Sequence, residues 1–239
     1  KDDKMISSQD QGSSPFHMMR ARLNAPGISA ETMFDCLMDS EYREAWDKQM
    51  TRYEHIGALD QYNTVSYYAL KVMSPVAPRD FVMENSWRNT EGEKAIISRS
   101  VYHEDWPPQK DIVRGIVMMS GALIRPLSSG GCSVTYVSQT DPGGKLPAWL
   151  VNRVSKLIGP QVLEKISRAA AEYDQWKRSH RPDFKPWRNP QQMSFLPRLE
   201  LEKCSVSPDT SSCAVQVNSA ASLAPSLSSS TSTELSLQL

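Results

Sequence analysis

The residues in this sequence with the clearest chemical potential are arginines that stand within or beside otherwise apolar segments. They are Arg43, Arg79, Arg99 and Arg114. Arginine is rarely fully buried unless its charge is paired, so each is expected to form an ion pair, with Asp80 and Asp111 as candidate partners. This expectation is strongest for Arg79, because Asp80 follows it directly.

Arg43 has a different setting, which suggests ligand binding. Glu41-Tyr42 precede it and Trp46-Asp47 follow it, which places Arg43 at the end of a short predicted helix. A guanidinium can bind a phosphate through two parallel hydrogen bonds. The sequence therefore predicts that Arg43 lies at the mouth of a cavity, where it can grip a phosphate group.

No pattern for nucleophilic or phosphate-loop catalysis is present. There is no Gly-x-Ser-x-Gly elbow, and the four histidines have no partner pattern that favours a Ser or Cys nucleophile. Gly130-Gly131 opens no helix and lacks a following Lys-Ser/Thr, so it is predicted to form a hairpin turn. His103, followed by Glu104-Asp105, and Glu84 are the remaining acid-base candidates, and a solvated charge cluster is the simpler interpretation of the His103 segment. An enzyme is not predicted, and no cofactor is expected.

Charge and cysteine content limit the classes of partner. The 239 residues contain 27 Lys plus Arg and 27 Asp plus Glu, so no net charge attracts the chain to nucleic acid or to anionic membranes. The cysteines form no Cys-x-x-Cys pair and have no histidine at ligand spacing, so reduced thiols are expected. No apolar run approaches the ~20 residues of a membrane-spanning helix, and the first residues have no signal-peptide core. The expected location is the cytoplasm.

The elements that must position these residues begin with a short helix and continue as strands. Ser29 is a predicted N-cap for a helix over 29–39, with apolar residues at helical spacing. Runs rich in β-branched and aromatic residues, separated by turn residues, then predict strands at 63–72, 80–87, 94–102, 112–124 and 132–139. Because the links are short, an antiparallel meander is expected.

After Pro147 the apolar period changes to that of a helix. The pattern from Trp149 to Tyr173 predicts one long amphipathic helix with a kink at Gly159-Pro160. A curved antiparallel sheet followed by one long helix indicates an α+β fold in which the sheet wraps around the helix and leaves a cavity between them. Residues expected along this cavity include Val65, Met83, Ile97, Met118 and Val137.

The two ends of the chain are predicted to lack regular structure. Residues 1–14 are polar, and from Gln191 onward Ser, Thr and Pro replace apolar residues, so neither segment can bury enough apolar surface to offset the entropy of ordering it. The expected organisation is a disordered tail over 1–14, a globular domain over 15–190 and a disordered Ser/Thr-rich tail over 191–239.

Several collinear motifs within 16–190 resemble START lipid-transfer domains. Asp39-Ser-Glu-Tyr-Arg-Glu-Ala-Trp-Asp47 is similar to the family's Asp-x-x-Tyr-Arg-x-x-Trp-Asp signature. The agreement continues in order through 78–82, 106–114 and 141–150. The final segments, Tyr173-Asp-Gln-Trp-Lys177 and Phe184-Lys-Pro-Trp187, resemble the subgroup of phosphatidylcholine transfer protein.

The resemblance implies a helix-grip fold, in which a curved antiparallel sheet encloses a tunnel for one lipid and the C-terminal helix forms its lid. It assigns the phosphate contact to Arg43 and two walls of a choline-binding aromatic cage to Tyr68 and Phe81. The third wall falls at Met118, which is not aromatic, and a further phosphate contact falls at Ser120. Because an aromatic face holds a cation, the loss of one wall favours a broader choice that includes phosphatidylethanolamine.

START domains begin with a helix and two strands before the element that matches Phe16–Leu23, and residues 1–15 resemble none of these. An N-terminally truncated domain is therefore expected, with an uncovered sheet edge that invites pairing.

The predicted function is to bind one glycerophospholipid, phosphatidylcholine or phosphatidylethanolamine, and to transfer it between membranes. The lid helix would open at a membrane surface, to which the protein would bind peripherally. The residues expected to favour this contact are Trp149, Lys156, Lys177, Arg178 and Arg181. A lipid-sensing regulatory module and a helix-grip enzyme that acts on a bound apolar substrate are the alternatives.

Overall fold

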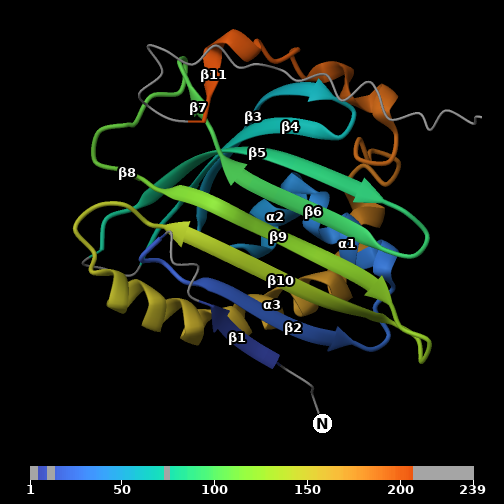
Figure 1. Ribbon diagram of the computed structural model, residues 1–239. Coiled ribbons are helices and arrows are strands. Elements are labelled where there is room, and N and C mark those ends of the chain that lie inside the picture. The colour runs from blue at the N-terminus through green and yellow to red at the C-terminus, as the bar shows by residue number, and fades with distance from the viewer. Residues whose placement is uncertain (1–4, 10–13, 73–75, 207–239) are drawn as a thin grey trace, which may run out of the picture. The chain divides into compact units, whose positions relative to one another are not determined.

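The computed structural model describes residues 5–9, 14–72 and 76–206, which all belong to one compact unit, Lys1–Pro208. Its main element is a large antiparallel sheet (Figure 1). In spatial order its strands are β1 (Met5–Gln9), β2 (Met18–Ala25), β10 (Cys132–Asp141), β9 (Ile116–Pro126), β6 (Lys94–Ser100), β5 (Arg79–Asn89), β4 (Asn63–Leu70) and β3 (Met50–Asp60). The short strand β8 (Val113–Arg114) pairs with β5 in parallel, and β7 (Tyr102–His103) pairs with β11 (Cys204–Ser205).

The predicted α+β class and antiparallel meander are confirmed, because all five predicted strand segments fall on β4, β5, β6, β8 with β9, and β10. The predicted hairpin turn at Gly130-Gly131 joins β9 to β10, and the Leu127 N–H donates to the Gly131 carbonyl at 3.1 Å. Gly131 has a φ of 80°, and a Cβ there would lie 2.4 Å from the Ala25 carbonyl oxygen. Only glycine fits this position.

Strand β3 was not predicted. The pairing of this segment with β4 shifts register at three points. Irregular pairing of this kind disturbs the two-residue alternation by which a strand is recognised in a sequence.

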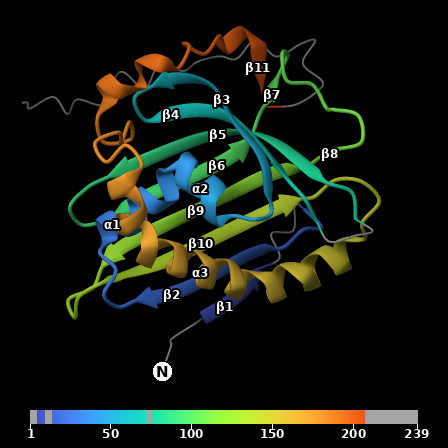
Figure 2. The ribbon, with the colours of Figure 1, turned by 180° about the vertical axis from the view of Figure 1, so that it is seen from behind.

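Three helices lie on one face of the sheet (Figure 2). Helix α1 (Ala30–Met38) begins as predicted at Ser29, whose hydroxyl accepts the Thr32 N–H at 2.9 Å. Helix α2 (Ser40–Trp46) is capped by Asp39, whose carboxylate accepts the Tyr42 N–H at 3.1 Å. Helix α3 (Ala148–Ser179) is the predicted long helix and continues through Gly159-Pro160. No helix among the described residues is both long and apolar enough to span a bilayer.

The main core lies between the helices and the face of the sheet that they cover, which we call the inner face. The register places Ile96, Ala122, Tyr136 and Ala21 in one row across β6, β9, β10 and β2 on this face. These residues pack with apolar side chains of α1 and α3, among them Phe34, which is completely buried. The opposite, outer face carries a smaller cluster on β4 and β5 that includes Tyr67 and Val82.

The expected disorder of residues 1–14 is wrong for Met5–Gln9. These residues form β1 and pair with β2 over five positions. Pairing with an existing strand edge satisfies backbone groups without the need for an apolar segment, so polar composition did not reveal it. The predicted uncovered edge at β2 is therefore covered by β1, and one strand precedes the element that matches Phe16–Leu23.

The expected disorder of residues 191–239 is wrong for its first part, and residues 207–239 lie outside the described residues. Residues 190–206, which we call the strap, contain two 3-10 helices, Pro190–Phe195 and Leu201–Lys203, and end in β11 (Figure 1). The Ala58 N–H donates to the Pro197 carbonyl and the Leu199 N–H donates to the Ala58 carbonyl, both at 2.9 Å. The strap thus runs along β3, and Leu199 covers the outer-face cluster.

Candidate functional site

Arg43 projects from α2 into a polar and aromatic group on the inner face. Its Nε lies 3.3 Å from Asp47 Oδ2, one turn further along the helix. The Tyr68 hydroxyl on β4 donates to the same carboxylate oxygen at 3.1 Å. The guanidinium lies 5.0 Å from the Tyr68 ring centroid and 5.8 Å from that of Trp46. The predicted proximity of Arg43 and Tyr68 therefore exists, with Asp47 as the link.

Arg43 lies deep in the fold and yet remains accessible. Burial by itself lowers the pKa of its guanidinium, but Tyr68 and Asp47 outweigh burial and raise the pKa above its ordinary value, so Arg43 is charged. Its side chain nevertheless keeps 38% of its surface accessible. A side chain enclosed by protein can keep this accessibility when it borders an internal space, which is the setting that a buried ligand requires.

The other predicted ligand-binding residues, Phe81, Ser120 and Met118, have three different settings. Phe81 pairs with Tyr68 across β4 and β5, and their ring centroids lie 6.5 Å apart. Ser120 on β9 bonds instead to Tyr136 on β10, with their hydroxyl oxygens 3.1 Å apart. Met118 is half-buried at the register shift between β9 and β10, and in the described part of the chain it makes no polar or ring contact with the other four.

Tyr53 and Tyr136 belong to this site and were missed by sequence reasoning. Tyr53 on β3 pairs with Tyr68, burial raises its pKa, and Arg43 acts against that rise. Tyr136 in turn helps to raise the pKa of Arg43. Tyr53 could not be placed without β3, whereas Tyr136 lies in a predicted strand, on the same face as Val134 and Ser138 by the two-residue alternation.

The accessibility of the inner face changes along the strands. Near α1 the inner face is inaccessible to solvent, because Trp87, Ile124 and Val134 are buried against the helices. In the middle of the sheet and toward the N-terminal half of α3, inner-face side chains are only half-buried although they lie in central strands. These residues are Met83, Asn85, Ser98, Ser120, Tyr136 and Ser138.

A pocket of about 170 Å³ lies in this region, between strands β2 and β10 and the N-terminal half of α3. Its lining comprises His17, Met19, Tyr136, Ser138, Thr140, Val151, Asn152, Ser155, Ile158, Gly159 and Val162. Of the residues expected along the cavity, Met83 faces inward, whereas Val65, Ile97 and Val137 lie on the outer face. The two-residue period of a strand predicts that its side chains alternate between the two faces of the sheet. It does not predict which of the two faces the helices cover.

The signature around Arg43 also builds a clamp for the end of α3. Asp39 is 2% exposed, and its Oδ2 accepts from Lys177 Nζ at 2.8 Å and from the Tyr173 hydroxyl at 3.0 Å. Tyr42 donates from its hydroxyl to the Ala169 carbonyl at 2.7 Å. Burial, and secondarily the Asp39 charge, raises the pKa of Tyr173, so this phenol stays a donor. Asp39 and Tyr42 therefore hold α3, while Arg43 and Asp47 pair with each other beside Tyr68.

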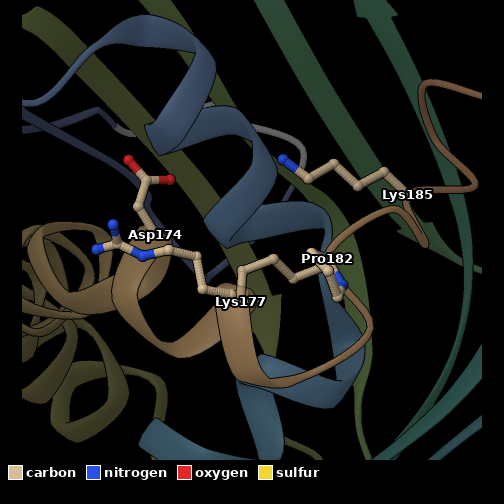
Figure 3. Close-up of a pocket in the computed structure, with 5 residues that line it drawn as sticks. Asp174, Lys177, Pro182 and Lys185 are labelled. Carbon is tan, nitrogen blue, oxygen red and sulfur yellow. The ribbon is translucent and has the colours of Figure 1, made fainter.

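A second buried carboxylate completes the clamp. Asp35 accepts from Lys185 Nζ and Trp187 Nε1, both at 2.8 Å, and from Arg188 Nε at 2.6 Å. Beside it lies a surface pocket of about 230 Å³ lined by Asp174, Lys177, Arg178, Pro182 and Lys185 (Figure 3). Because Asp39 and Asp35 already hold Lys177 and Lys185, this pocket is a surface feature of the clamp.

The expected ion pair between Arg79 and Asp80 is wrong. Arg79 donates to backbone carbonyls, those of Ala77 and, at 3.1 Å, Pro142. Asp80 is completely buried and accepts from Arg114 Nε at 2.8 Å and from Arg114 Nη2 at 3.0 Å. Successive residues in a strand point to opposite faces, so Arg79 and Asp80 cannot share a site. The other predicted partner, Asp111, takes a left-handed conformation with a φ of 66°.

The acid-base candidates lie outside the inner-face group around Arg43. Glu84 lies on the outer face of β5 and pairs with Arg99 at 2.7 Å. His103 lies in β7 next to β11, and its Nδ1 accepts the Asp105 N–H at 3.3 Å. Among the described residues there is no group of three or more His, Cys, Asp or Glu side chains that could hold a metal ion.

Comparison with known proteins gives a consistent result. Residues 1–177 match the profile of the START domain family. START domain-containing protein 10 from Mus musculus and that from Homo sapiens are each 37% identical over 190 residues, which cover 80% of this chain and 65% of theirs. This chain therefore spans slightly less than two thirds of the length of those relatives.

Solved structures agree with the sequence match. The crystal structure of human STARD10 matches with a TM-score of 0.80 and 33% identity, over 85% of this chain and 87% of that chain. Human StAR-related lipid transfer protein 5 matches with a TM-score of 0.65 and 23% identity, over 70% of this chain and 82% of that one, which supports the fold.

Proposed function

Because the chain belongs to the START domain family, we propose that it binds one glycerophospholipid between its sheet and α3 and transfers that lipid between membranes. The observation that carries this proposal is Arg43, a charged guanidinium that is enclosed by the fold and still accessible. The names of two matched proteins, StAR-related lipid transfer proteins 5 and 13, support lipid transfer as the activity.

The energetics explain why such a carrier is needed and what decides its choice of lipid. Two acyl chains carry roughly 30 methylene groups at ~0.8 kcal/mol each, so their transfer from water to an apolar site is worth on the order of 25 kcal/mol. A bilayer and an apolar cavity offer the chains similar surroundings. The contacts of the headgroup therefore decide which phospholipid is selected.

The headgroup contacts favour phosphatidylcholine or phosphatidylethanolamine without strict selection of choline. Arg43 is the phosphate contact in this proposal, and Tyr68 and Phe81 supply aromatic faces. The Arg43 guanidinium already lies over the Tyr68 ring at 5.0 Å, and Met118 offers no ring. Fewer free aromatic faces weaken the binding of a quaternary ammonium, so a primary ammonium is accepted as well.

Contact with the membrane is assigned to the N-terminal half of α3. Trp149, Val154 and Ile158 are exposed there by 65%, 40% and 44%, and Lys156 is exposed beside them. Aromatic and apolar side chains next to cations favour the interface of an anionic membrane. Lys177 and Arg181 are not available for this contact, because they pair with Asp39 and Glu41.

Replacement of Arg43 with leucine is expected to lower phospholipid affinity by about 10- to 100-fold, because hydrogen bonds to a charged group are worth ~1.5–3 kcal/mol. Native mass spectrometry of the purified protein measures the bound lipid, and circular dichroism checks the fold. The matched control is Arg99→Leu, an arginine that pairs with Glu84 on the outer face. Unchanged lipid binding in folded Arg43→Leu protein would remove Arg43 from the site.

A further inference from the structure

The pocket beneath the N-terminal half of α3 is lined by four side-chain hydroxyl groups, by His17 and Asn152 and by apolar residues, and by no lysine, arginine, aspartate or glutamate. We propose that it binds the ester carbonyl groups of the lipid, so that the protein selects diester glycerophospholipids over diether ones. This inference rests on the proposed function and adds a second point of recognition. Arg43 selects the phosphate, and the pocket selects the linkage between glycerol and the hydrocarbon chains.

The hydroxyl groups of the pocket have donor capacity left over. Ser155 lines it from α3, is half-buried, and makes no side-chain hydrogen bond within the described part of the chain. Ser138 and Thr140 bond to each other, with their oxygens 3.2 Å apart. Because one proton serves that bond, the second hydroxyl proton of the pair remains free. The pocket therefore presents donors to whatever occupies it.

The lining restricts the chemistry of the occupant to an uncharged acceptor. Without Lys or Arg the pocket offers no permanent positive charge to neutralise a phosphate, and without a carboxylate it offers no negative charge for an ammonium. Hydrocarbon alone would cover the Ser155 hydroxyl and give it no partner, which is unfavourable. The group that satisfies free O–H donors within an otherwise apolar setting of Met19, Val151 and Ile158 is a carbonyl oxygen, and each acyl ester supplies one.

The pocket lies where one lipid molecule can reach both points of recognition. Tyr136 lines the pocket, and among smaller effects it also helps to raise the pKa of Arg43, so the two side chains lie within electrostatic reach of each other. Ser138 lies two residues further along β10, about 7 Å away at the rise of a strand. In a glycerophospholipid only the short glycerol backbone separates the phosphate from the ester carbonyls. The pocket volume of about 170 Å³ leaves room for several non-hydrogen atoms, since a water molecule occupies ~30 Å³.

The position of Ser155 over the pocket is fixed by Asn152, one turn earlier on α3. Asn152 Oδ1 accepts the His17 N–H at 2.9 Å, and its Nδ2 donates to the Pro15 carbonyl at 3.0 Å. Residues three apart on a helix share a face, so these two bonds turn Ser155 toward β10. The donor is thus held in place before a ligand arrives.

The test compares two phosphatidylcholines with identical headgroups and chain lengths, one with two acyl esters and one with two alkyl ethers. The full chain is incubated with vesicles that contain both lipids in equal amounts, and native mass spectrometry measures the ratio bound. We expect about a tenfold preference for the diester, because a net hydrogen bond is worth roughly one power of ten at most. Equal binding of the two lipids overturns the inference, whereas binding of neither overturns the proposed function.

Ser155→Ala tests the assignment to this pocket. The variant should lose several-fold in diester binding and keep its diether binding, so that the preference shrinks. Alanine is the best helix former, so α3 should remain intact. The control, Ser167→Ala on the same helix but outside the pocket lining, should keep the wild-type ratio. An equal loss of both lipids in Ser155→Ala would assign Ser155 a structural role and overturn the assignment.

Discussion

Replacing Asp39 with alanine is expected to lower the free energy of unfolding by about 3 to 5 kcal/mol, the usual cost of removing one partner of a buried ion pair. The carboxylate is 2% exposed and accepts from Lys177, from the Tyr173 hydroxyl and from the Tyr42 N–H. Its loss leaves the Lys177 ammonium buried without its partner and uncaps α2. Urea unfolding followed by circular dichroism measures the change.

Two further variants decide whether the clamp is the cause. Asp105→Ala breaks an exposed ion pair with Lys203, in which the aspartate keeps 60% of its surface, and should change the stability little. Adding Lys177→Met to Asp39→Ala removes the stranded charge and should recover part of the lost stability. If Asp39→Ala were as stable as the wild type, the end of α3 would be held by its apolar packing alone.

The clamp shows why the signature around Arg43 could be recognised in the sequence but not divided into roles. Asp39, Tyr42, Arg43 and Asp47 lie within nine residues, and spacing alone does not say which of them face the core. Asp39 binds Lys177 across 138 positions of sequence and Asp35 binds Trp187 across 152. Contacts between residues this far apart depend on the fold. Local patterns therefore identified the two sequence segments, but not the hydrogen bonds that join them.

The sheet was predictable where strands are rich in β-branched and aromatic residues, as in β4 and β10. It was missed in β1, whose polar residues are ordered only by pairing with β2, and in β3, whose register shifts break the alternation. Because β3 carries Tyr53, this omission also removed one member of the site. The hydroxyl-lined pocket was missed for a related reason, since Ser138 and Ser155 come from a strand and a helix that only the fold brings together.

The strap was missed because its few apolar anchors stand among polar residues. Met193 is buried in the main core, and Leu199 is buried in the outer-face cluster. Leu199 is 8% exposed and packs with Val65, Tyr67 and Val82, in a segment whose composition otherwise matches a disordered tail. Gly57 lets the strap approach β3, since a Cβ at that position would lie 3.0 Å from the Pro197 carbonyl oxygen. Buried apolar residues such as Met193 and Leu199, together with backbone hydrogen bonds to β3 and the pairing of β11 with β7, order a segment that average composition describes as unstructured.

Leu199→Ala is therefore expected to lower the free energy of unfolding by about 2 to 4 kcal/mol, because truncation of a buried leucine removes its transfer free energy and leaves a cavity. The matched control is Leu201→Ala on the same strap, where the leucine is 56% exposed and the change should stay within about 0.5 kcal/mol. Urea unfolding measures both variants, and limited proteolysis should cut the strap of Leu199→Ala before it cuts the control. If both variants had wild-type stability, burial of Leu199 in the outer-face cluster would contribute nothing to holding the strap.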